Sequence, residues 1–256
     1  MKIFSIIKTY FTLPIKALGY AINKQDFRDG IYLRYGWEIP RSPRHCQCGK
    51  ENNMNHALSC ANGGFVMMRH NRIRNLEAEL MREVGYDIKI EPELLPLGDN
   101  QLIKGNNSEK ARLDVSGIGI WGLQERTFVD VRVINPNAPS YFNTTPANVY
   151  KRHEQEKKRV YGERIIEIEK SSFTPLIFST SGGMGQEATI FHKRLASQIA
   201  EKRNEDYNHV MNYIRTRLRF CILKSTLVAL RGYRGKKNEA EPISNISFNM
   251  IPSEEN

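Results

Sequence analysis

The sequence lacks any apolar run long enough to cross a membrane. A transmembrane helix needs about 18 or more consecutive apolar residues, and no segment of the 256-residue chain approaches this length. Lys8 and Lys16 interrupt the apolar residues near the N-terminus, and the long apolar region and small-residue cleavage site of a signal peptide are missing. The sequence therefore predicts a protein that is not secreted and has no membrane partner. We expect it to be nuclear in a eukaryote and cytoplasmic otherwise.

Cysteine is also scarce, with four residues in the chain, of which three fall between positions 46 and 60. In a chain that is not secreted, such clustering indicates metal binding and argues against disulfides. Zinc accepts three thiolates and one imidazole in tetrahedral geometry, and a Cys3His set without an open position is structural. The segment is poor in core residues and needs such a staple to fold. The predicted zinc ligands are Cys46, Cys48, His56 and Cys60.

Two details of this cysteine cluster leave alternatives open. The Cys-x-Cys opening is tighter than the usual two-residue gap, and His45 and His70 are close enough in sequence to replace one ligand. The fourth cysteine, Cys221, lies on an apolar helical face with Val210 and Leu218. We therefore expect Cys221 to be a buried, inert thiol.

Acidic residues are outnumbered, because 38 Lys and Arg stand against 28 Asp and Glu and give a formal net charge of +10. Residues 191–237 carry 12 of the basic residues and 3 acids, whereas residues 238–256 carry four acids and no Lys or Arg. Such a surplus favours an anionic partner, most often nucleic acid, with a merely soluble basic protein as the alternative. Candidate phosphate-binding residues are Lys193, Arg194, Arg215 and Arg219, unless they form a solvated amphipathic face.

Hydrophobic residues make up 40% of the chain, which is enough for a packed core. Periodicity and turn residues indicate strands and helices that alternate in the second half, so we predict an α/β fold. Expected strands lie near 88–95, 112–120, 127–133 and 174–180. Expected helices cover part of 10–40, then 69–84, 145–170, 186–203 and 206–231. In the first of these, Phe27, Ile31 and Tyr35 lie four apart and predict one apolar helical face.

Two aspartates in the expected strands are candidate metal ligands. Asp114 and Asp130 are equidistant from Gly122, so in a simple hairpin they would face each other. Two ionised carboxylates at that distance repel unless a cation lies between them. Mg²⁺ is the natural candidate, because it takes one or two carboxylates and keeps waters for chemistry. Ordinary salt bridges at strand ends are the alternative interpretation.

A lysine on the following helix completes the candidate site. Lys157 shares a helical face with Tyr161 that should contact the sheet, whereas Lys158 lies off this face. A lysine beside two metal-binding aspartates could orient or deprotonate the attacking water. The alternative is that Lys157 pairs with Glu154 on the same helix and reaches out to solvent.

The order of these residues resembles a known arrangement. The motifs on which this resemblance is based are Phe27-Arg28-Asp29, Arg34-Tyr35-Gly36, Cys46-Gln47-Cys48-Gly49, His56 to Cys60, Arg69-His70-Asn71, Arg112-Leu113-Asp114, Phe128 to Val133, Lys157 with Tyr161, and Pro175 to Gly185. Over about residues 10–232 the chain resembles the C-terminal segment of non-LTR retrotransposon proteins of the restriction-like-endonuclease type. Those proteins carry a reverse transcriptase, then a Cys/His zinc knuckle, then a nuclease. The chain contains no reverse transcriptase, so we expect a terminal fragment or a truncated copy of such a protein.

The resemblance implies a PD-(D/E)XK restriction-endonuclease-like core, a mixed sheet flanked by helices. It divides the chain into a helical entry (1–43), a zinc knuckle (44–66), a nuclease domain (67–234) and a disordered acidic tail (235–256). Asp114 and Asp130 take the positions of the two metal aspartates, and Lys157 that of a catalytic lysine displaced onto the helix. Leu113 replaces the proline of the PD motif. Arg132 stands where the lysine of an ordinary nuclease would be, so Lys157 and Arg132 remain alternatives.

The expected function is thus metal-dependent hydrolysis of phosphodiester bonds in DNA. The expected cofactors are structural zinc and catalytic Mg²⁺ or Mn²⁺, and the expected partner is DNA, with element RNA as a second one. The alternative is a catalytically decayed, zinc-stapled nucleic-acid-binding module or scaffold. Oligomeric state is not indicated by the sequence.

Overall fold

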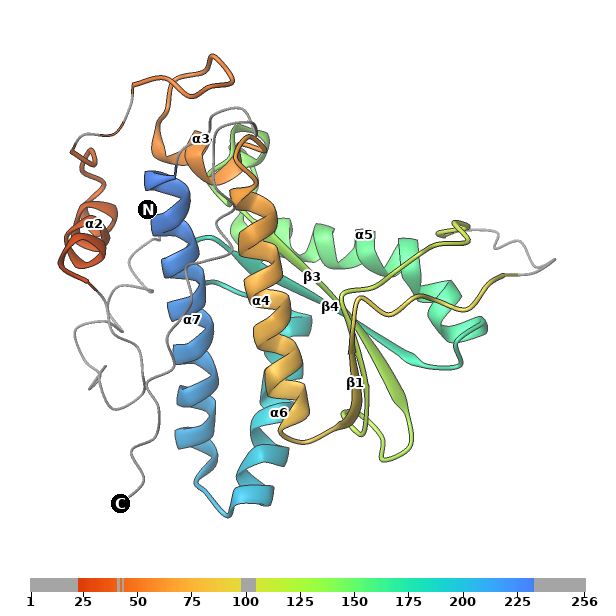
Figure 1. Ribbon diagram of the computed structural model, residues 1–256. Coiled ribbons are helices and arrows are strands. Elements are labelled where there is room, and N and C mark those ends of the chain that lie inside the picture. The colour runs from red at the N-terminus through yellow and green to blue at the C-terminus, as the bar shows by residue number, and fades with distance from the viewer. Residues whose placement is uncertain (1–22, 41, 43, 98–104, 233–256) are drawn as a thin grey trace.

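The computed structural model describes residues 23–40, 42, 44–97 and 105–232 (Figure 1). The predicted acidic tail (235–256) and much of the predicted entry segment lie outside this range. None of the described helices combines the length and apolar character needed to span a membrane. The elements are α2 (Lys24–Tyr35), α3 (Met54–Ser59), α4 (Phe65–Arg82), β1 (Tyr86–Ile90), β2 (Val115–Ile118), β3 (Arg126–Ile134), η3 (Pro139–Tyr141), α5 (Pro146–Glu167), β4 (Ser172–Ser179), α6 (Gln186–Arg203) and α7 (Tyr207–Arg231).

These elements form a mixed α/β fold around a four-stranded sheet in the order β1-β2-β3-β4. The first three strands are antiparallel neighbours, and β4 runs parallel to β3 after the α5 crossover. Alternate residues of β3 serve opposite faces, because side chains alternate along a strand. Val129 and Val131 pack into the core with α4 and α6, whereas Phe128 packs with Ile165 of α5. The predicted mixed sheet flanked by helices is therefore confirmed.

The largest core lies on the α4 and α6 side of the sheet and is closed by α7, which runs beside α4 (Figure 1). Helix α7 places Val210, Ile214 and Leu218 at intervals of four, and all three are fully buried. Burying a side chain of this size stabilises the fold by about 1.5–3 kcal/mol. Asp206 caps the helix by accepting hydrogen bonds from two main-chain N–H groups. Cys221, predicted to be buried, is half-buried, and burial raises the pKa of its thiol to about 12.

The register of the β2–β3 hairpin sets the geometry of the candidate site. Val115 pairs with Val129 and Ser116 with Phe128. Continuing this register by one residue places Asp114 opposite Asp130, as the sequence predicted. Asp114 itself lies one residue before β2, which is shorter than the predicted strand. Antiparallel pairing with the segment after β1 continues through Asp114, because the Glu91 N–H donates to the Asp114 carbonyl at 2.8 Å and Glu93 pairs with Arg112.

Helix α2 differs from the expected entry helix in the side that it buries. The pattern suggested a face formed by Phe27, Ile31 and Tyr35, but Phe27 and Tyr35 are 44% and 56% exposed. The buried side instead contains Asp29, whose carboxylate pairs with Arg231 at the end of α7 at 2.6 Å. Leu33, one turn later, packs into the largest core. One apolar contact and one charged pair between distant parts of the chain therefore hold this side of the helix.

The predicted knuckle packs directly on the rest of the protein. Leu58 of α3, Phe65 of α4 and Ala229 of α7 form one small core. Asn135, after β3, donates to Ser59 Oγ at 3.2 Å. Helix α4 begins at Phe65, two residues before the predicted domain boundary, so no described linker separates the two parts.

Candidate functional site

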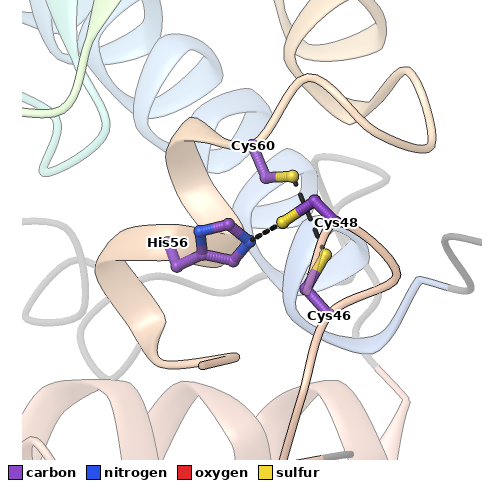
Figure 2. Close-up of side chains that lie close together, drawn as sticks. All are labelled: Cys46, Cys48, His56 and Cys60. Carbon is purple, nitrogen blue, oxygen red and sulfur yellow. Dashed lines mark hydrogen bonds between the residues drawn. The ribbon is translucent and has the colours of Figure 1, made fainter. Parts of the chain in front are cut away.

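The Cys/His group is built by one tight turn and one short helix (Figure 2). The turn brings Cys46 and Cys48 together, with Cys46 N–H donating to the Lys50 carbonyl at 2.8 Å. Helix α3 carries His56, and Cys60 follows one turn later, where its N–H donates to the His56 carbonyl at 2.8 Å. All four side chains therefore point toward one space.

The donor atoms of this group have the spacing of a tetrahedral site. Cys46 Sγ lies 3.7 Å from Cys60 Sγ, and Cys48 Sγ lies 3.3 Å from His56 Nε2. Two sulfurs bonded to zinc at about 2.3 Å would be about 3.8 Å apart in a tetrahedral site. The four ligand atoms all lie within 4.8 Å of one another. This group can hold a zinc ion, and neither His45 nor His70 belongs to it.

The two aspartates lie on the two arms of one hairpin, Asp130 in β3 and Asp114 one residue before β2. Asp130 is 6% exposed, and burial is the main cause that raises its pKa. Asp114 Oδ2 accepts the Val131 N–H at 2.6 Å. Burial and then the charge of Asp130 raise the pKa of Asp114 to about 7. Each carboxylate is therefore destabilised in its ionised form, which is the electrostatic condition that a bound cation relieves.

Lys157 supplies the positive charge nearest to this pair. Its Nζ lies 2.6 Å from Asp130 Oδ2, and the side chain is about one-fifth exposed. The neighbouring Lys158 points away and pairs with Glu187 at 2.6 Å. Arg132, the alternative cation, pairs with Glu156 at 3.0 Å. The structure thus brings Lys157 to the aspartates and directs Arg132 to a different carboxylate.

The alternative pair between Glu154 and Lys157 is not formed. Glu154 is buried and accepts the Glu187 N–H at 3.0 Å, so it caps the start of α6. The Gly185 N-cap leaves no room for a side chain, since a Cβ there would lie 2.1 Å from Glu154 Oε1. Helix α5 therefore offers one polar side chain to α6 and another to the sheet.

His70 also lies at this site. The sequence suggested it as a substitute zinc ligand and within the Arg69-His70-Asn71 motif, but did not place it beside the aspartates. Its Nε2 lies 3.2 Å from Asp114 Oδ2 and 3.1 Å from the Val131 carbonyl. Burial and the nearby Arg74 lower the pKa of His70, so the ring is neutral near pH 7. The preceding residue, Arg69, is buried and donates to the Leu58 carbonyl, which holds this turn of α4 beside α3.

The predicted phosphate-binding residues lie on α6 and α7 in varied surroundings. Lys193 is exposed, whereas Arg194 donates to the Ile120 carbonyl at 2.9 Å. Arg215 and Arg219 are half-buried, and burial followed by the charge of Arg215 lowers the pKa of Arg219. Part of the basic surplus of this region therefore has internal partners, and the DNA-binding role of these residues stays a prediction.

A scan against models of known protein families finds no match, and a search of curated proteins finds none either. The resemblance to retrotransposon endonucleases therefore stays a prediction from the sequence.

The raised pKa of Asp114 predicts a pH-dependent cost to stability. Its ordinary pKa is 3.8, so between about pH 4 and pH 7 the folded state keeps a proton that the unfolded state loses. The free energy of unfolding should therefore fall as the pH rises through this window. We expect Asp114→Asn to stabilise the zinc-loaded protein by about 2 kcal/mol at pH 8 and by little at pH 4. Urea unfolding at both pH values measures this, and equal effects would show a change in packing instead.

Proposed function

We propose that this protein is a metal-dependent DNA endonuclease that hydrolyses phosphodiester bonds. The observation that carries the proposal is the cluster of Asp114, Asp130 and Lys157, in which two destabilised carboxylates lie beside one half-buried ammonium. A nuclease needs positive charge to offset the negative charge of the phosphodiester during attack. The two carboxylates can hold a cation that supplies this charge, and the ammonium adds to it.

The residues fit a hard divalent cation, Mg²⁺ or Mn²⁺, because both carboxylates supply oxygen ligands and lack a full complement of positive charge. When bound, the cation would lower the pKa of a coordinated water and neutralise charge on the phosphate. Asp114 and Asp130 would hold it. Lys157, fixed by Asp130, would orient the attacking water and stabilise the charge that develops on phosphorus-bound oxygens.

We propose a PD-(D/E)XK nuclease as the finer assignment, which the mixed sheet flanked by helices allows, and its derivation from a mobile element rests on the sequence resemblance alone. Asp130 comes from β3, Asp114 from the residue before the neighbouring β2, and the lysine from the crossover helix α5, in the order that the sequence resemblance implies. The Cys3His group would serve as a structural zinc knuckle. We further propose that the protein works on DNA, in the nucleus if the source is a eukaryote and in the cytoplasm otherwise.

Cleavage of supercoiled plasmid tests the proposed activity. Zinc-loaded protein should nick the plasmid with Mg²⁺ or Mn²⁺, and Asp114→Ala and Asp130→Ala should each lose at least about 100-fold of the rate. Asp87→Ala, which removes an exposed carboxylate paired with Arg126, is the matched control and should retain the rate. If the wild-type protein cleaves no DNA with either cation, the decayed binding module takes the place of this proposal.

The second candidate function, nucleic-acid binding alone, is favoured by the net charge of +10. It predicts that affinity for duplex DNA falls steeply as salt rises, because released counterions drive such binding. Charge reversal of Arg215 and Arg219 should weaken binding of all sequences equally. Fluorescence anisotropy in 50 and 200 mM salt measures this, with Glu201→Ala on exposed α6 surface as a control that should not weaken binding. Binding that does not depend on salt would contradict the prediction.

A further inference from the structure

Three atoms of different chemical kinds that can ligate a metal lie close together beside Asp114. They are the His70 imidazole nitrogen Nε2, Asp114 Oδ2 and the main-chain carbonyl of Val131, and Nε2 lies 3.2 and 3.1 Å from the two oxygens. Ligands on adjacent corners of an octahedron, with bonds of about 2.1 Å, lie about 3.0 Å apart. The two distances from His70 Nε2 therefore match those between neighbouring ligands of one cation.

The second nitrogen of His70 has the partner that a metal-bound imidazole requires. His70 Nδ1 lies 3.5 Å from Asn71 Oδ1. Both atoms that face Nε2 are acceptors, so without a cation Nε2 carries the hydrogen of the neutral ring. When a cation occupies Nε2, that hydrogen belongs on Nδ1, where Asn71 can accept it. Outer partners of this kind orient ligating histidines in metal sites.

We propose that His70 is a nitrogen ligand of the cation at Asp114 and that it makes the site select a first-row transition cation, such as Mn²⁺, over Mg²⁺. This inference rests on the proposed function in one respect: the cation that His70 binds is the one that the aspartates hold. Mg²⁺ takes oxygen ligands, whereas imidazole suits transition metals. A mixed site of carboxylate, carbonyl and imidazole therefore favours Mn²⁺, with the aspartates retaining some affinity for Mg²⁺.

Mn²⁺ alone, added to the zinc-loaded full chain without DNA, tests the proposal by electron paramagnetic resonance. The signal of free Mn²⁺ should reveal one bound ion per chain, and pulsed spectra should show coupling to a directly bonded nitrogen. His70→Gln should lose the nitrogen coupling and weaken Mn²⁺ binding about tenfold or more, while Mg²⁺ affinity, measured by competition, should change less than threefold. His209→Ala, on exposed α7 surface, should leave both properties unchanged.

The possible failures are distinguishable. Asp114→Asn should lose the Mn²⁺ ion although the Cys/His group is intact, which excludes His56 as the source of the nitrogen coupling. Mn²⁺ binding at Asp114 with the same coupling and affinity in His70→Gln would overturn the assignment of His70 and leave the aspartate site standing. No bound Mn²⁺ in the wild-type protein would overturn both. Circular dichroism of each variant confirms that it is folded, and His70→Ala provides a second variant if His70→Gln is not.

Discussion

Lys157→Ala is expected to reduce the rate of metal-dependent DNA cleavage by about 100-fold or more, whereas Lys158→Ala should keep at least about a third of it. The two lysines are adjacent in sequence and carry the same charge. Lys157 lies 2.6 Å from Asp130, and Lys158 pairs with Glu187 at the start of α6. The pair of variants therefore separates a local role at the aspartates from a general contribution of positive charge to DNA binding.

The stability of each variant must also be measured, because removal of Lys157 leaves the buried Asp130 carboxylate without its partner. Removing one partner of a buried ion pair destabilises proteins by about 3–5 kcal/mol. Lys157→Arg keeps the charge and serves as the folded comparison. It should still lose much of the rate, because a planar guanidinium cannot reproduce the position of a compact ammonium. Equal loss in Lys157→Ala and Lys158→Ala, at equal stability and DNA affinity, would contradict the proposed role of Lys157.

Removal of zinc is expected to have the largest effect on the fold. Zinc binding to Cys/His groups contributes about 10–16 kcal/mol of apparent free energy at neutral pH, and the ligands order only when the metal is bound. Cys60→Ser should therefore release zinc and unfold residues 44–64. Loss of α3 would also expose Phe65 and Ala229, which it covers in the small core with Leu58. Zinc analysis and hydrogen exchange measure the two effects.

Cys221→Ala is the matched control for this experiment, because it removes a thiol that lies outside the metal group. This variant should bind one zinc per chain and show unchanged exchange in α3. A strong chelator should reproduce the effect of Cys60→Ser in the wild-type protein. Retention of full protection in α3 after the metal is removed would show that the knuckle folds without it.

Local patterns were sufficient to predict much of this protein. The spacing of Cys46, Cys48, His56 and Cys60 identified one group, because all four lie within a single turn and helix. The bounds of α6 were predicted at both ends, and the equal distances of Asp114 and Asp130 from Gly122 predicted their register. In each case the information lies within a short stretch of chain or in one simple hairpin.

Contacts between distant segments were beyond such patterns. His70 and Asp114 are 44 residues apart, and the rotation of α4 that brings them together depends on how the whole helix packs over the hairpin. The pairing of Asp29 with Arg231 joins residues 202 positions apart and reverses the expected buried side of α2. Neither contact produces a repeating pattern in the sequence, because each involves a single polar residue. The helices that carry these residues are packed mainly through other, apolar side chains.

The double use of α5 has a consequence for how the site can change during evolution. Glu154 caps α6 and Lys157 pairs with Asp130, so both bonds depend on the same axial rotation of one helix. An insertion of one residue earlier in α5 would turn both side chains away by about 100°. A rotation of α5 that displaces the lysine would therefore also break the bond of Glu154 to the start of α6. Selection for a stable fold alone would preserve the placement of Lys157, even in a lineage where cleavage no longer brought any advantage.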